Sequence, residues 1–184
     1  MDQAYLKATP ENTRIFDFIL QLKTIPRSGW QKKLGIVHSE SVADHAYSVA
    51  AIAMVLSDIK KLDTGKILKM ALLHDLAESI VGDLTPEDYP KSKKIRLENN
   101  AMRKILSTFD DAISRQYWSL WMQYQKKSSK EAKLLHQIDK LEMALQADVY
   151  EKSGHKKEHL KPFFDSAKKQ IKDSDLKKIL QKLS

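Results

Sequence analysis

The segment LLHDLAESIVGD, residues 72–83, sets three ionisable side chains on what would otherwise be an apolar helical face. The apolar residues before His74 recur at the i, i+3, i+4 and i+7 spacing of a face turned towards a core, so a continuing helix would bury His74, Asp75 and Glu78. An unpaired ionised group in a low-dielectric interior costs several kcal/mol, which is comparable with the whole stability of a domain. A bound cation would compensate for that cost.

Two further helical patterns carry residues of the same kind. His45 lies within the apolar stripe of the segment that begins near Ser41, and Asp139 follows Leu135 and Ile138 at the edge of another stripe. Alone, a core histidine is more often hydrogen-bonded than metal-bound, and an aspartate at a helix edge is usually solvated. Together, two imidazoles and two carboxylates make a mixed nitrogen and oxygen set that suits Zn, Mn, Fe, Co or Ni. The sequence contains no cysteine, so thiolate ligands are excluded.

The elements that must position these residues are helices almost throughout. Apolar residues recur at helical spacing from Thr9-Pro10 onwards, and only five glycines and five prolines interrupt the pattern. No alternating strand pattern, internal repeat or linker competes, so we expect one all-α domain over residues 1–184. The expected helices cover approximately residues 10–25, 41–53, 64–82, 95–109, 113–124, 130–150, 160–167 and 176–183, with residues 26–39 as a loop.

Composition narrows the class of protein. Hydrophobic residues make up 42% of the 184 residues, near the globular norm. The formal net charge of +8 comes from lysine pairs spread along the chain, without a run of five like charges, so we expect an attraction for small anions and no nucleic-acid site. The first residues lack the features of a signal peptide, and no uninterrupted apolar run reaches membrane-spanning length. We therefore expect a soluble cytoplasmic protein that binds no membrane.

Around the same residues the sequence resembles the HD-domain phosphohydrolases, which are named after an adjacent His-Asp pair. The resemblance is to their 5′-deoxynucleotidase branch and rests on four stretches: PRSGW at 26–30, ESVADHAY at 40–47, ALLHDLAESIVGDLTPED at 71–88 and AKLLHQIDKLEMALQADVYE at 132–151. These stretches span most of residues 15–151. The resemblance implies a single HD-domain helical bundle, with C-terminal helices over residues 152–184 about which it says little.

The resemblance also implies roles for the residues that could do chemistry. Glu78 matches the carboxylate that activates the attacking water, and Arg27 matches the arginine that orients the phosphate. Some family members hold a second cation, for which Glu78 and Asp83 are the candidate ligands. The primary metal ligands implied by the family pattern are His45, His74, Asp75 and Asp139.

On the substrate side, Trp30 matches a tryptophan beside the nucleotide. In the bacterial enzymes of this branch the arginine and the tryptophan are adjacent, whereas here Ser28 and Gly29 intervene. A loop that contacts the sugar is matched by Asp83, Leu84, Thr85 and Pro86.

These resemblances imply an enzyme that uses a divalent cation (Co, Mn, Zn, Ni, Fe or Mg) to hydrolyse 5′-deoxynucleoside monophosphates to nucleoside and phosphate, and they favour a homodimer. The alternatives are HD phosphohydrolases that act on nucleoside triphosphates, cyclic nucleotides or (p)ppGpp. A di-iron HD oxygenase would need more histidine ligands, for which His136 is the candidate three residues before Asp139. The last alternative is a catalytically idle, metal-stabilised scaffold, which would need the metal ligands but neither Glu78 nor Arg27.

Overall fold

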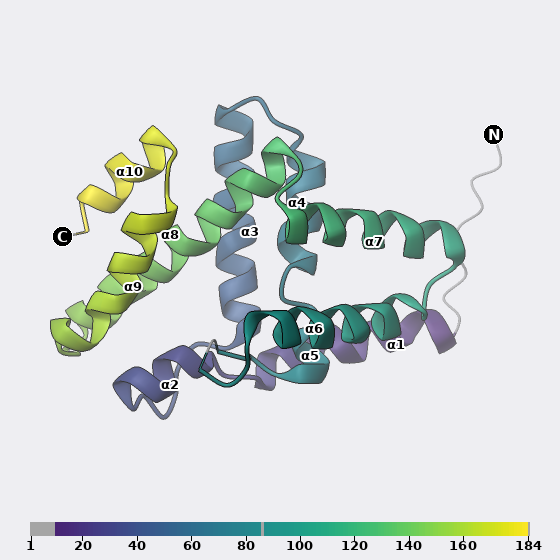
Figure 1. The fold of residues 1–184 in the computed structure, drawn as a ribbon, viewed down its shortest axis with the longest axis horizontal. Helices are drawn as coiled ribbons and strands as arrows, with labels where there is room; N and C mark the ends of the chain where they lie inside the picture. Colours follow the sequence, from purple (N-terminus) through teal and green to yellow (C-terminus); the bar gives the residue numbers. More distant parts are fainter. Residues whose placement is uncertain (1–9, 86, 184) are drawn as a thin grey trace.

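Helices form the framework of the described residues, which are 10–85 and 87–183 in this computed structural model (Figure 1). Apart from an isolated bridge between Pro26 and Ser41, no β-pairing joins any of these residues. The all-α prediction is therefore confirmed. In chain order the helices are α1 (Pro10–Gln21), the short 3-10 helix η1 (Leu22–Thr24), α2 (Ser28–Leu34), α3 (Val42–Ile59), α4 (Thr64–Leu73), α5 (Glu78–Val81), α6 (Lys91–Leu106), α7 (Asp111–Lys126), α8 (Lys130–Lys152), α9 (Lys157–Gln170) and α10 (Ser174–Gln181).

Helix α3 lies at the centre of the molecule, packed against α4 and α8. It begins with a reciprocal cap: the Ser41 hydroxyl oxygen accepts from the Asp44 N–H, and the Asp44 carboxylate accepts from the Ser41 N–H. Its inner face includes Val42 and Val49, which are fully buried. By length and mean hydropathy α3 could cross a membrane, alone among the helices of the described residues, but a core helix of a soluble protein passes the same test.

The segment predicted as one helix over residues 64–82 is broken in the middle. Helix α4 ends at Leu73, and α5 begins only at Glu78. The His74 Nδ1–H donates to the Ala71 carbonyl oxygen at 2.6 Å, which is the acceptor that a continuing helix would give to the Asp75 N–H. The backbone then tightens into turns with i to i−3 hydrogen bonds, such as Glu78 N–H to the Asp75 carbonyl at 2.9 Å. The prediction of a single helix was wrong, because a side chain competes for its hydrogen bonds.

Residues 26–39 were predicted to form a loop but contain α2. Trp30 anchors this short helix in the core, and Gly35 ends it in the left-handed conformation with φ 64°. Helix α9 packs along α8 and against α2, while α6 and α7 extend to the other end of the molecule (Figure 1). The two terminal helices predicted near residues 160–167 and 176–183 are present as α9 and α10. The helices between these two ends, α3, α4, α5 and α8, carry the candidate site.

Candidate metal centre and active site

Two buried imidazoles face the same point with their Nε2 atoms free of hydrogen bonds. His45 of α3 is fully buried, and His74 at the end of α4 is 4% exposed. Each Nδ1 has a partner: Glu142 Oε2 lies 2.6 Å from that of His45, and the Ala71 carbonyl oxygen lies 2.6 Å from that of His74. These acceptors place a proton on each Nδ1, so Nε2 is the ring atom left to bind another ligand. Both Nε2 atoms are buried without a hydrogen-bond partner.

Two carboxylates complete this set of donors. Asp139 Oδ1 of α8 lies 3.3 Å from His45 Nε2, and Asp75 Oδ2 lies 3.6 Å from His45 Nε2 and 3.2 Å from His74 Nε2. The ligand atoms of His45, His74 and Asp139 lie within 4.8 Å of one another, with Asp75 beside them. Burial alone would raise the pKa of Asp139, but Lys140 and His45 hold it well below its usual value. The nitrogen and oxygen donors and the orphaned Nε2 atoms fit a divalent cation.

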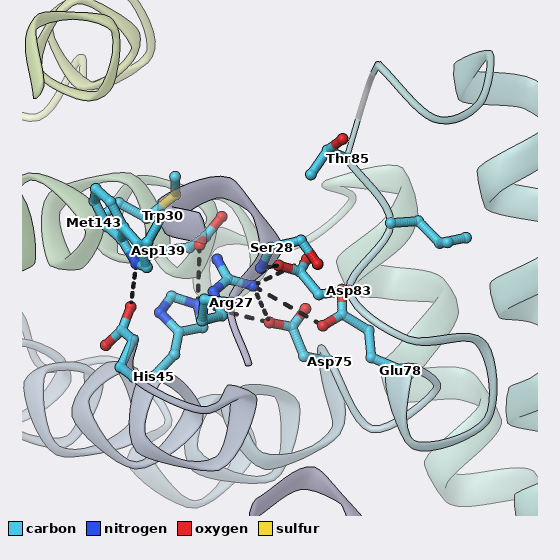
Figure 2. Close-up of polar contacts among 12 residues, drawn as sticks. Arg27, Ser28, Trp30, His45, Asp75, Glu78, Asp83, Thr85, Asp139 and Met143 are labelled. Carbon is cyan, nitrogen blue, oxygen red and sulfur yellow. Dashed lines mark hydrogen bonds and ion pairs between the residues drawn. The ribbon is translucent and has the colours of Figure 1, made fainter. Parts of the chain in front are cut away.

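Arg27 lies among three carboxylates next to this cluster (Figure 2). Its Nη1 atom is 3.5 Å from Asp75 Oδ2, 3.5 Å from Asp83 Oδ1 and 3.9 Å from Glu78 Oε2. Burial opposes the charged form, yet these carboxylates raise the pKa of Arg27 above its usual value. Asp83 Oδ2 also accepts from the Ser28 N–H at 2.7 Å, so Asp83 fixes both the guanidinium and the backbone beside it. Arg27 therefore presents a permanent positive charge to the candidate metal ligands, which are called the metal cluster below.

Glu78 begins α5 on the other side of Arg27. It is 3% exposed, and its Oε2 atom has no hydrogen-bond partner. Burial raises the pKa of Glu78 well above its usual value, and the neighbouring Asp75 and Asp83 carboxylates add to this. A carboxylate with a raised pKa is a stronger base than an ordinary one. Glu78 therefore combines a buried, unengaged oxygen with enhanced basicity next to the cluster.

The two carboxylates considered as ligands of a second metal ion lie around the guanidinium of Arg27 in this structure. Glu78 and Asp83 both approach Arg27 Nη1, and Lys94 Nζ lies 3.8 Å from Glu78 Oε1. His136, the candidate additional ligand of a di-iron centre, already has a partner at Nε2. Its Nε2–H donates to the Tyr124 carbonyl at 2.8 Å, and its ring stacks on that of Tyr124 with centroids 4.0 Å apart.

A cavity of about 660 Å³ opens over this centre. The loop after α5 forms part of its lining: the Leu84 carbonyl accepts from Lys94 Nζ at 2.6 Å, and Thr85 Oγ1 lies 3.0 Å from Lys32 Nζ. Pro86, which was predicted to belong to the same loop, lies outside the described residues. Trp30 lines the cavity but is only 2% exposed. Asp83, Leu84 and Thr85 are thus brought to the same cavity as the metal cluster.

Sequence reasoning missed two residues that hold the site together. Glu142 supports His45 from a position 97 residues away in the chain, and Lys94 joins Glu78, Glu98 and the Leu84 carbonyl. Glu142 lies three residues after Asp139 on α8, so a second acid close to a candidate metal ligand on the same helix was a detectable signal. Nothing in the local pattern around Lys94 distinguishes it from the exposed lysines of α6.

Comparisons with known proteins show the family of this chain. The HD domain family model matches residues 19–180. The chain is 38% identical over 164 residues to the 5′-deoxynucleotidase HDDC2 of Homo sapiens, covering 89% of this chain and 79% of the relative. It is 42% identical over 159 residues to the 5′-deoxynucleotidase HDDC2 of Dictyostelium discoideum, covering 80% and 83%.

Solved structures show the same likeness. The PH0347 protein from Pyrococcus horikoshii OT3 superposes with a TM-score of 0.78 at 34% identity, over 92% of this chain and 96% of that protein. The family model spans the candidate metal ligands and α9, and the human relative matches 89% of the chain. The chain therefore belongs to the HD domain family.

Proposed function

We propose that this protein is a metal-dependent phosphatase that cleaves 5′-deoxynucleoside monophosphates to deoxynucleoside and phosphate. The observation that carries the proposal is the pair of buried, unpartnered imidazole Nε2 atoms that face Asp75 and Asp139 next to Arg27. The relatives named above are 5′-deoxynucleotidases, which supports the choice of substrate. In this proposal His45, His74, Asp75 and Asp139 hold one divalent cation.

The cation, when bound, would supply Lewis acidity that makes water nucleophilic and positive charge that offsets the phosphate. Arg27 binds phosphate oxygens through its planar guanidinium, which Asp75 and Asp83 already hold in place. Glu78 Oε2 takes a proton from the attacking water, because it is buried, basic and free of hydrogen bonds. As the water oxygen bonds to phosphorus, the bond to the 5′-oxygen breaks. That oxygen takes up a proton from solvent and the deoxynucleoside leaves, and Glu78 then returns its proton to solvent.

The substrate is expected to lie between the metal cluster and the loop of Asp83, Leu84 and Thr85, which would contact the sugar. A monophosphate would meet the positive charge of Arg27 beside the bound cation, and the relatives that are 5′-deoxynucleotidases support a substrate of this class. Phosphate monoesters need charge neutralisation and positioning more than covalent help, so this set of groups is sufficient.

Phosphate release from a panel of nucleotides tests the proposal. The metal-loaded enzyme should release phosphate from dAMP, dGMP and dTMP faster than from the corresponding ribonucleotides, and should leave dATP nearly intact. Release of triphosphate from dNTPs with inert monophosphates would instead establish a triphosphohydrolase. Absence of hydrolysis with every nucleotide, at full metal loading, would support the idle scaffold.

A further inference from the structure

One wall of the cavity comes from a helix to which the proposed mechanism gives no role. Helix α9 contributes Pro162, Phe163, Ser166 and Gln170 to the lining. Pro162, Ser166 and Gln170 follow one another at intervals of four residues, so they form one row along a single face of α9. The row begins apolar and ends in a hydroxyl and an amide. It therefore offers two kinds of surface to a molecule in the cavity.

The apolar part of this wall continues from α9 onto α2 and α8. Phe163 stacks on Trp30 with ring centroids 3.9 Å apart, and Met143 lies one turn beyond Asp139 on α8 and also lines the cavity. Figure 2 shows Trp30 and Met143 on the opposite side of Arg27 from Thr85. A flat apolar ring placed beyond the phosphate position can pack against this surface.

The Phe163–Trp30 stack is held firmly from behind. The Trp30 Nε1–H donates to Glu40 Oε1 at 2.7 Å, and Tyr150 packs edge-on against the indole with centroids 5.1 Å apart. Trp30 is thereby committed to the core. Phe163 is 6% exposed and has Lys33 Nζ 5.2 Å from its ring centroid, so it supports the apolar wall from behind. Pro162 and Met143 are the more exposed apolar side chains of this wall. A rigid wall loses little conformational entropy when a ligand binds to it.

The polar part of the wall has hydrogen-bonding capacity to spare. The Gln170 Nε2–H donates to Ser166 Oγ at 2.9 Å. The Ser166 hydroxyl still has its own proton to donate, and Gln170 Oε1 can still accept. This pair can meet the edge of a planar heterocycle with one donor and one acceptor.

Other parts of the cavity lining are charged. They include Glu87, Lys91, Lys94, Glu98 and Lys127, and Lys33 of α2 and Lys140 of α8 also line the cavity. Packing a neutral ring against these groups would take them out of water without replacing their hydrogen bonds. The α8–α9 wall is therefore the better surface for a neutral aromatic ligand.

We propose, on the basis of the proposed function, that α9 and Met143 form the nucleobase subsite of the enzyme. Pro162 and Met143 contact the face of the base and Phe163 supports them from behind, while Ser166 and Gln170 hydrogen-bond its edge. Rotation of the glutamine amide exchanges its donor and acceptor, so the subsite accepts all common bases with only a modest preference. Discrimination among bases thus resides in the C-terminal helices, and discrimination of the phosphate resides in the metal cluster.

The test compares substrates with and without a base. kcat/KM is measured for dAMP, dTMP and 2-deoxyribose 5-phosphate with the wild type, Phe163→Leu, Gln170→Ala and Lys169→Ala. Lys169 precedes Gln170 and is exposed, but it does not line the cavity, so it is the matched control. Wild type should prefer both nucleotides over deoxyribose 5-phosphate. Phe163→Leu shrinks the ring that supports the apolar wall, so it should lower kcat/KM for the nucleotides about tenfold and leave deoxyribose 5-phosphate unchanged.

Gln170→Ala should change the ratio of dAMP to dTMP by about three- to tenfold, as expected for one lost hydrogen bond, whereas Lys169→Ala should leave the ratio unchanged. Equal kcat/KM for deoxyribose 5-phosphate and the nucleotides in the wild type would overturn the subsite while leaving the proposed phosphatase intact. Equal losses on all three substrates in both Phe163→Leu and Gln170→Ala would also overturn it, since α9 would then only support the fold. No release from any of the three would refute the proposed function itself.

Discussion

Removing the carboxylate behind His45 should weaken metal binding without removing any metal ligand. Glu142 Oε2 lies 2.6 Å from His45 Nδ1, and both side chains are almost completely buried. Glu142→Met keeps a similar length but offers no comparable acceptor, so the imidazole loses the group that sets its tautomer and its orientation. Loss of such a supporting partner typically costs about 10- to 100-fold in metal affinity, or about 1.4–2.8 kcal/mol.

The assay is a Co²⁺ titration in competition with a chelator, with thermal unfolding of the metal-free proteins measured in parallel. Glu142→Gln should lose less affinity than Glu142→Met, because the amide oxygen can still accept from Nδ1. Glu151→Met is the matched control, since Glu151 lies on the same helix but makes only a surface ion pair with Lys157 at 3.7 Å. If Glu142→Met bound Co²⁺ as tightly as the control, the reasoning about His45 would be refuted.

Three further predictions concern metal binding and pH. Asp139→Ala and His74→Ala should abolish stoichiometric metal in elemental analysis, and with it the stabilisation by saturating metal, about 2.7 kcal/mol at a hundredfold excess over Kd. Burial lowers the pKa of His45, but contacts with Asp139 and Glu142 outweigh burial and raise the pKa to about 9. Metal uptake at pH 7 should therefore displace about one proton from the metal-free protein, which calorimetry in buffers of different ionisation enthalpy would measure. Metal affinity should rise with pH up to about pH 9. Burial lowers the pKa of His136 to about 4, so between about pH 6.5 and pH 4 the unfolded chain binds a proton that the folded protein does not. The free energy of unfolding should therefore decrease as the pH is lowered from about 6.5 to about 4. Urea unfolding of His136→Asn should show a smaller decrease over the same range.

The residues of the site could be recognised in the sequence because they are polar and stand among apolar residues. His45, His74 and Asp139 each stand on or beside an apolar helical stripe, and the fold brings their ligand atoms within 4.8 Å of one another. Helix periodicity is a local property, so the stripes located the helices well. The same periodicity showed which polar residues lie on a buried face.

The departures from the sequence-based predictions have physical causes that helical periodicity does not contain. The break after α4 follows from the hydrogen bond between the His74 side chain and the Ala71 carbonyl, which spacing alone cannot reveal. Helix α2 is short and is stabilised by the burial of Trp30 against Phe163, a residue from the other end of the chain. The partners of Glu142 and Lys94 likewise come from distant segments. Long-range contacts of this kind require the three-dimensional fold.

The central claim is that the buried cluster holds a metal and that Glu78 then moves the proton of the attacking water. The most direct measurement is single-turnover hydrolysis of dAMP by Glu78→Gln, with metal content and dAMP affinity determined on the same preparation. Because glutamine preserves shape but cannot accept this proton, the rate should fall by roughly 10²- to 10⁴-fold while metal content and affinity stay at wild-type values. A near-normal rate in the fully metal-loaded Glu78→Gln variant would contradict this account.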